Sequence, residues 1–244
     1  MKLIIAGATS LLGTEIVRQS LQIREITQVI SLALQPVQLD KSIDTSKLKN
    51  VVIRDYSEYP DDVKAEFAGA DACIWTVAVT PLHTGRVELK RVCQDYIKLG
   101  FEAICEAGPA RPFRFMYLSV EGIPRDPTKI PVIMPDYHIM RCNTELMVLK
   151  FPTEKDGVEV CIARPGVIAN SSAWSRALVA NLFRIVNLFG RPPSEYTTES
   201  ARSGSVTPGH GWVREGDTLE CRTRSNWTKG AEISQYASAF MNYF

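Results

Sequence analysis

Residues 1–21, MKLIIAGATSLLGTEIVRQSL, constrain the fold of this chain more than any other stretch. Leu3–Ala6 is an apolar run without polar alternation, which is typical of a parallel strand buried on both faces. A turn bounded by Gly7 and Gly13 follows, and apolar residues then recur at helical spacing as far as Leu21. A strand, a glycine turn and a helix in this order predict a turn that can cradle a diphosphate.

Three residues of this turn have distinct expected parts in binding the diphosphate. Gly7 permits the tight bend, and Gly13 lets the helix approach the strand closely. Ser10 stands where the usual pattern has a glycine, so its hydroxyl can donate to a phosphate while its side chain crowds the approach. The alternative is an ordinary turn with two structural glycines. The predicted phosphate-binding residues are Gly7, Thr9, Ser10, Leu11, Leu12 and Gly13.

Composition narrows the classes of protein and partner. The 28 Lys and Arg residues nearly balance 27 Asp and Glu without a long run of either sign, so we expect neither nucleic acid nor a membrane as partner. The six cysteines form no C-x-x-C pair, and Cys73 and Cys161 lie in apolar runs, as reduced core thiols of a cytoplasmic protein do. No apolar stretch is long enough to span a bilayer. We expect no metal site, because three histidines are scattered without ligand spacing: His83, His138 and His210.

Strand-like apolar runs alternate with amphipathic segments along most of the chain. We expect strands at residues 3–6, 28–32, 48–53, 72–79, 114–120 and 158–163, and helices at 61–67, 87–107, 136–151 and 174–189. This alternation predicts an α/β fold, a Rossmann-like doubly wound parallel sheet in a single domain of residues 1–244. Residues 1–168 would form the cofactor-binding core, and 169–244 the substrate side and a divergent C-terminal part. Within that part we expect 197–230 to be irregular, with a short helix near 231–241.

In such a sheet the ligand lies at the carboxyl ends of the strands. Leu34 follows the second strand, where an acid would favour NAD and an arginine NADP, and neither is present. Asp55 follows the third strand and can accept a hydrogen bond from an adenine amino group or cap the next turn. Thr76, Val77 and Ala78 should lie beside the ribose and the nicotinamide.

Three residues are candidates for catalysis. Ser119 lies at the end of the fifth strand, and Tyr137 and Arg141 are one helical turn apart on a predicted helix. A serine can polarise a substrate oxygen, a tyrosine can pass a proton to or from it, and a cation lowers the phenol pKa from about 10. The alternatives are a surface helix pair for Tyr137 and Arg141, and a satisfied strand-end hydroxyl for Ser119.

These motifs resemble the short-chain dehydrogenase/reductase superfamily in its atypical branch of NmrA-like and TIP30-like proteins, with similarity to small fungal AflX-like oxidoreductases of secondary metabolism. The resemblance covers residues 1–168 and rests on Gly7-Ala8-Thr9-x-x-x-Gly13, Ser119, Tyr137-x-x-x-Arg141 with Glu145, and Arg164-Pro165-Gly166. It implies NAD(P) as cofactor, NADPH slightly favoured, with further cofactor contacts from Pro165 and Val167. The family's lysine, which bonds the nicotinamide ribose, is replaced by Arg141, which keeps the charge but is bulkier and planar.

The sequence therefore predicts an NAD(P)-dependent oxidoreductase acting on a carbonyl or alcohol of a small aromatic or polyketide-type metabolite, in fungal secondary metabolite biosynthesis. An NmrA-like regulatory protein that senses NAD(P) without turnover is an alternative of another class. A non-redox isomerase or ring-opening enzyme on the same scaffold is a third. The expected partner is a small-molecule substrate, and the sequence leaves the oligomeric state open.

Overall fold

The computed structural model describes residues 1–79, 84–120, 123, 124, 126, 128 and 134–164, and the backbone of residues 219–222. Its strands form one sheet in the order β3-β2-β1-β4-β5-β6-β7, in which the first six are parallel and β7 is antiparallel to β6. The predicted Rossmann-like α/β fold is confirmed. The strands are β1 (Lys2–Ala6), β2 (Gln28–Ala33), β3 (Leu48–Val52), β4 (Ala72–Trp75), β5 (Phe113–Leu118), β6 (Val158–Ala163) and β7 (Leu219–Arg222).

One expectation about the elements was wrong. Residues 197–230 are not irregular throughout, because β7 pairs with β6; a four-residue strand between Gly- and Thr-rich segments gives no clear periodic signal. The helix expected at 87–107 is present as one continuous helical stretch with a π-helical turn in its middle. The helices are α1 (Leu11–Gln22), α2 (Asp61–Ala65), α3 (Arg86–Lys90), the π-helical η1 (Arg91–Asp95), α4 (Tyr96–Glu106), α5 (Pro135–Val148) and α6 (Phe151–Glu154). The helices expected at 174–189 and 231–241 lie outside the described residues.

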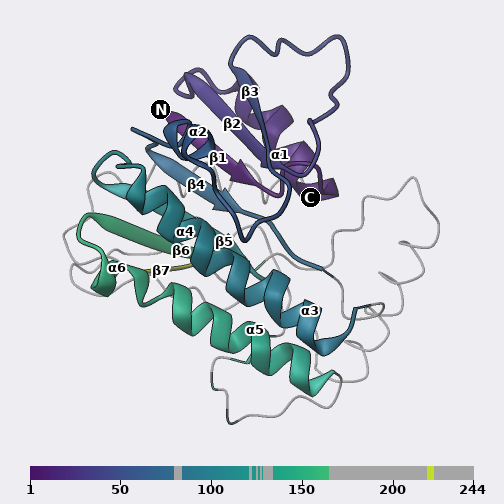
Figure 1. The fold of residues 1–244 in the computed structure, drawn as a ribbon, viewed down its shortest axis with the longest axis vertical. Helices are drawn as coiled ribbons and strands as arrows, with labels where there is room; N and C mark the ends of the chain where they lie inside the picture. The colour runs from purple at the N-terminus through teal and green to yellow at the C-terminus, as the bar shows by residue number, and fades with distance from the viewer. Residues whose placement is uncertain are drawn as a thin grey trace, which may run out of the picture.

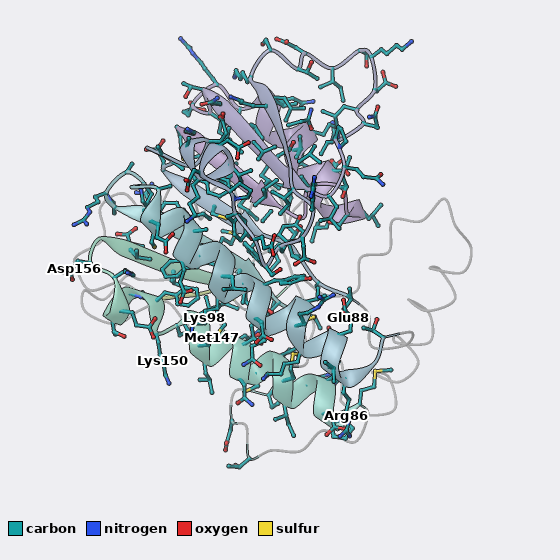
Figure 2. All side chains as sticks on the ribbon, viewed as in Figure 1. Arg86, Glu88, Lys98, Met147, Lys150 and Asp156 are labelled. Carbon is teal, nitrogen blue, oxygen red and sulfur yellow. The ribbon has the colours of Figure 1, made fainter. Side chains whose placement is uncertain are left out.

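Alternate residues of the strands supply the two hydrophobic cores, one on each face of the sheet. In β1, Leu3 and Ile5 pack with side chains of α1 on one face of the sheet. Ile4 packs on the other face with side chains of α4 such as Phe101. Figure 1 shows α4 and α5 crossing the same face of the sheet. Their outward sides carry exposed charges such as Lys98 (Figure 2). The buried strands of a doubly wound sheet therefore have the continuous apolar runs that predicted them.

The strand order reverses direction at β1, which has β2 on one side and β4 on the other. At such a switch point the loops that leave neighbouring strands separate and leave a crevice at the carboxyl ends. Ala6 is opposite Trp75 in the register, so Gly7 and Thr76 leave the sheet side by side. No helix in the described parts of the chain has the length and apolar character to cross a bilayer.

Candidate functional site

The two glycines of the first turn have the structural roles predicted for them. Gly7 has φ +81°, in the left-handed region that favours glycine. A Cβ on Gly13 would lie 2.2 Å from the Gly7 carbonyl oxygen and 2.9 Å from the Ala8 Cα. Only a residue without a side chain lets α1 begin this close to the end of β1, so the helix start is held directly above the switch point.

Ser10 is the N-cap of α1 and is turned toward its own helix. Its Oγ accepts a hydrogen bond from Gly13 N at 2.9 Å and lies 3.4 Å from the Thr76 hydroxyl. The amides of Leu11 and Leu12, at the first two helical positions, have no acceptor among the described residues. Free N–H groups at the positive end of a twelve-residue helix fit a diphosphate.

Tyr56 is a residue of this turn that the sequence analysis missed. Its hydroxyl accepts a hydrogen bond from Gly7 N and donates one to Leu32 O, both at 3.0 Å. Burial raises the pKa of this phenol, so it stays protonated and can keep donating. Tyr56 thus ties the glycine turn to the end of β2. The available signal was a hydroxyl-bearing residue immediately after the predicted strand-end acid.

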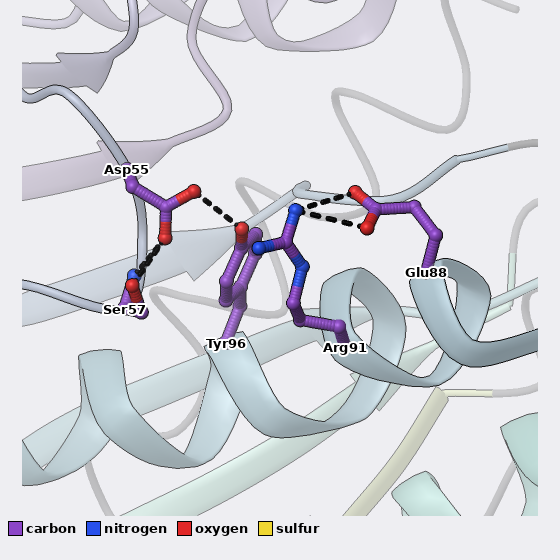
Figure 3. A network of polar contacts seen from close by, with 5 residues as sticks. All are labelled: Asp55, Ser57, Glu88, Arg91 and Tyr96. Carbon is purple, nitrogen blue, oxygen red and sulfur yellow. Dashed lines mark hydrogen bonds and ion pairs between the residues drawn. The ribbon is translucent and has the colours of Figure 1, made fainter.

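Asp55 sits in a polar network at the end of β3 (Figure 3). Its Oδ1 accepts from Ser57 N at 2.8 Å, and its Oδ2 accepts from the Tyr96 hydroxyl at 2.6 Å. The Arg91 guanidinium lies over the Tyr96 ring and pairs with Glu88 at 2.9 Å. Burial alone raises the pKa of Asp55, but these hydrogen bonds outweigh it and leave the pKa lowered. The turn-capping interpretation is confirmed, and the adenine contact stays a prediction.

The other residues expected around the cofactor lie at the same edge of the sheet. Leu34 directly follows β2 and is 52% exposed. The Thr76 hydroxyl, after β4, donates to Ala6 O at 2.8 Å and so holds β4 against β1. Next along the chain, Val77 is buried and Ala78 is exposed. Pro165 and Val167 lie outside the described residues.

Arg141 brings the predicted catalytic residues together. Its side chain is buried, with a relative exposure of 1%, and Nη2 donates to Leu118 O at 3.1 Å, next to Ser119. The guanidinium carbon lies over two rings, 5.1 Å from the centroid of Tyr117 and 6.0 Å from that of Tyr137. The alternative of a surface helix pair is therefore wrong. β5 is two strands from β1, so this cluster lies about 10 Å along the sheet from the glycine turn.

The structure corrects the expected acidity of Tyr137. We expected the nearby cation to lower the phenol pKa, and Arg141 does act in that direction. Burial of the ring acts more strongly the other way, and Cys93 adds to it, so the net pKa is raised above 10. Helical spacing identifies the cation beside the phenol, but it contains no information on how deeply the phenol is buried.

Unpartnered polar atoms gather at the end of β5. Within the described residues, six buried side-chain nitrogen or oxygen atoms lack a hydrogen-bond partner, and four of them belong to this cluster: Tyr117 OH, Ser119 Oγ, Arg141 Nε and Arg141 Nη1. The alternative of a satisfied strand-end hydroxyl for Ser119 is therefore wrong. Buried polar atoms in proteins are nearly always paired, so four unpaired atoms in one place favour a ligand site.

A buried ion pair holds α5 against the sheet. Arg164, directly after β6, donates through Nε to both Glu145 carboxylate oxygens, at 3.1 and 3.2 Å, and the two side chains are 6% and 3% exposed. Glu145 lies one turn beyond Arg141 on α5. The pair fixes the helix that carries Tyr137 to the end of β6. Both residues belong to the sequence motifs, but their pairing was not predicted.

Neither a scan against protein-family models nor a search of curated proteins gives a match. MoeE5 in complex with UDP-glucuronic acid and NAD is similar in structure, with a TM-score of 0.54, 18% identity, and coverage of 75% of this chain and 60% of MoeE5. A short-chain dehydrogenase/reductase from Saccharomyces cerevisiae has a TM-score of 0.52 and 14% identity, covering 77% and 83%. Yeast methylglyoxal/isovaleraldehyde reductase Gre2 complexed with NADPH has a TM-score of 0.53 and 14% identity, covering 68% and 58%.

At these identities the likeness shows the shared fold. This chain spans about three-fifths of the length of MoeE5 and of Gre2, at 60% and 58%. The fold does not by itself assign the activities of those proteins to this chain.

Proposed function

We propose that this protein is an NAD(P)-dependent oxidoreductase of the short-chain dehydrogenase/reductase type, acting on a carbonyl or alcohol of a small aromatic or polyketide-type metabolite. One observation carries the proposal. A glycine turn with free helix amides and a cluster of Ser119, Tyr137 and Arg141 occupy one edge of one sheet, about 10 Å apart. That separation suits a dinucleotide lying across the switch point.

The residues present fit such a cofactor. The amides of Leu11 and Leu12 with the Ser10 hydroxyl would hold the diphosphate, and the residues after β4 would line the ribose. Neither an acid that would repel a 2′-phosphate nor an arginine that would bind it follows Leu34 at the end of β2, so NADPH as the favoured form rests on the family resemblance alone. Bound there, the nicotinamide supplies or accepts the hydride.

The chain's own part is to position the substrate oxygen and to move one proton. Ser119 Oγ, which has no acceptor within the described part of the chain, would donate a hydrogen bond to that oxygen. Tyr137 would give its phenolic proton to the oxygen in reduction and take it back in oxidation. Arg141 would stabilise the phenolate that reduction leaves behind, because its guanidinium lies over the Tyr137 ring.

The test separates binding from turnover. Full-length protein is titrated with NADPH by fluorescence and then assayed for NADPH oxidation with quinones and aromatic ketones. We expect Tyr137→Phe to bind NADPH normally and to lose about 10²- to 10⁴-fold in rate, the usual contribution of a general acid. Tyr59→Phe is the matched control, since it removes an unpartnered buried hydroxyl elsewhere in the core. Failure of the wild type to bind NADPH or NADH contradicts the proposal.

An NmrA-like sensor of NAD(P) is the second candidate, and one observation favours it. The net pKa of Tyr137 is raised, so the phenol is not activated toward proton removal in the free protein. NADPH binding with no turnover of any carbonyl, unchanged in Tyr137→Phe, is the result that selects the sensor.

A further inference from the structure

The described residues offer the guanidinium of Arg141 far fewer hydrogen-bond acceptors than it has donors. An arginine presents five N–H groups in a planar fork. Leu118 O takes one of them at 3.1 Å, and Nε and Nη1 donate to nothing within the described part of the chain. Because the side chain is buried, water does not take up the remaining donors, and leaving them unpaired is costly.

Within the described part of the chain, no carboxylate compensates the charge of Arg141 either. Among the described residues no Asp or Glu lies within ion-pair distance of it. Glu145, one turn farther along α5, gives both of its oxygens to Arg164. The rings of Tyr117 and Tyr137 stabilise part of the charge through their π faces, but they accept none of the N–H groups at its edges.

The shape of these donors selects among ligand groups. A neutral ribose diol can accept hydrogen bonds from Nε and Nη1, but it brings no negative charge to a buried cation. A carboxylate does both, with a planar geometry that matches a guanidinium edge. It brings one negative charge against one guanidinium, whereas a phosphate monoester brings about 1.5 to 2. Two further buried hydroxyls without a partner among the described residues, those of Tyr117 and Ser119, belong to β5 and to the residue after it.

We propose that the substrate carries a carboxylate in addition to its reacting carbonyl or alcohol, and that Nε and Nη1 of Arg141 bind it. The inference rests on the proposed function, because Ser119 and Tyr137 handle the reacting oxygen of the same molecule. The substrate class is thus an oxo acid or hydroxy acid small enough to place both groups at the end of β5.

The experiment compares acids with neutral and phosphorylated counterparts on the full-length protein. Aromatic oxo acids and their methyl esters are assayed in pairs with NADPH, and dissociation constants are measured by calorimetry for the same pairs. We expect the wild type to prefer each acid by about tenfold or more, the effect of one well-formed charged contact. The same ring bearing a phosphate should bind more weakly than the carboxylate.

Arg141→Met keeps the length of the side chain and removes its charge and donors, so we expect the preference for acids to disappear. Lys98→Met is the control, since it removes an exposed positive charge from α4 and should keep the preference. Acids that bind no better than their esters, acids that do not bind at millimolar concentration, or a preference that survives in Arg141→Met each overturn the inference. If Arg141→Met does not fold, the wild-type ratio of acid to ester decides alone. NADPH binding is measured first on the same samples, because its absence refutes the proposed function instead.

Discussion

Replacing Gly13 by alanine sets two effects of opposite sign against each other. Gly13 lies inside α1, where alanine favours the helix by about 1 kcal/mol relative to glycine. The added methyl carbon would also lie 2.2 Å from the Gly7 carbonyl oxygen. Ordinary contacts of a Cβ begin at 3.4 Å, so helix and turn must separate by about 1 Å.

The structure indicates that the clash outweighs the helix propensity. The Gly7 carbonyl is not free to move, because it accepts from Ser10 N at 3.0 Å and from the Thr76 hydroxyl at 3.1 Å. Overpacking a rigid site costs about 1–3 kcal/mol, to which the lost hydrogen bonds of the turn add about 1. Against a gain of about 1, we expect a net loss of about 1–3 kcal/mol, which in a chain of this size lowers Tm by about 2–4 °C per kcal/mol.

Urea unfolding followed by tryptophan fluorescence measures this loss, and titration with NADPH measures binding by the displaced turn. The matched control is Gly85→Ala, which makes the same chemical change at a position where a Cβ has nothing within 4 Å. It should change stability by less than about 1 kcal/mol. If Gly13→Ala is instead stabilised, α1 does not approach the turn as closely as these distances state, and the diphosphate site loses its basis.

Three further predictions concern contacts outside the helix start. Tyr56→Phe removes the hydroxyl that accepts from Gly7 N, so we expect about 1 kcal/mol less stability in urea and weaker NADPH binding; unchanged binding would contradict the role in the turn. Burial, and then a hydrogen bond to a carboxylate, raises the pKa of Tyr96 to about 12. Because this exceeds the unfolded value of about 10, its stabilising effect is complete below pH 10 and is lost toward pH 12, and urea melts at stepped pH should show a shallower loss in Tyr96→Phe. Arg164→Gln removes the cation that pairs with the buried carboxylate of Glu145 and should cost about 3 kcal/mol, measured by thermal unfolding; a loss below 1 would mean that other groups compensate.

The sequence predicted the sheet well because burial on both faces leaves a continuous apolar run. The run 158–163 was predicted with the observed bounds of β6. The run 72–79 was predicted too long. β4 ends at Trp75, where its partner β1 ends at Ala6, and Val77 and Val79, which follow, pack in the hydrophobic core instead of pairing. Apolar character alone does not distinguish a strand from a buried loop that leaves it.

The candidate site was predicted only as far as strand ends and helical spacing reach. Those rules place Ser119 at the sheet edge and Tyr137 on the same face as Arg141. The contact of Tyr56 with Gly7 joins residues 49 positions apart, and local periodicity contains no information on it. The same is true of the pairing of Glu145 with Arg164, and of the π-helical turn beneath the site.

Burial changes the meaning of the tyrosine and arginine motif more than the exchange of lysine for arginine does. A cation beside a phenol in water would lower its pKa and favour removal of a proton from an alcohol. Here burial of Tyr137 outweighs Arg141, so the phenol keeps its proton at neutral pH. A protonated phenol beside a fixed cation is suited to donating a proton to a carbonyl oxygen, since the cation stabilises the phenolate that forms. The raised pKa therefore suits this phenol to the proton-donating role in reduction, and a carboxylate bound by Arg141 would offset part of the stabilisation that the cation gives to the phenolate.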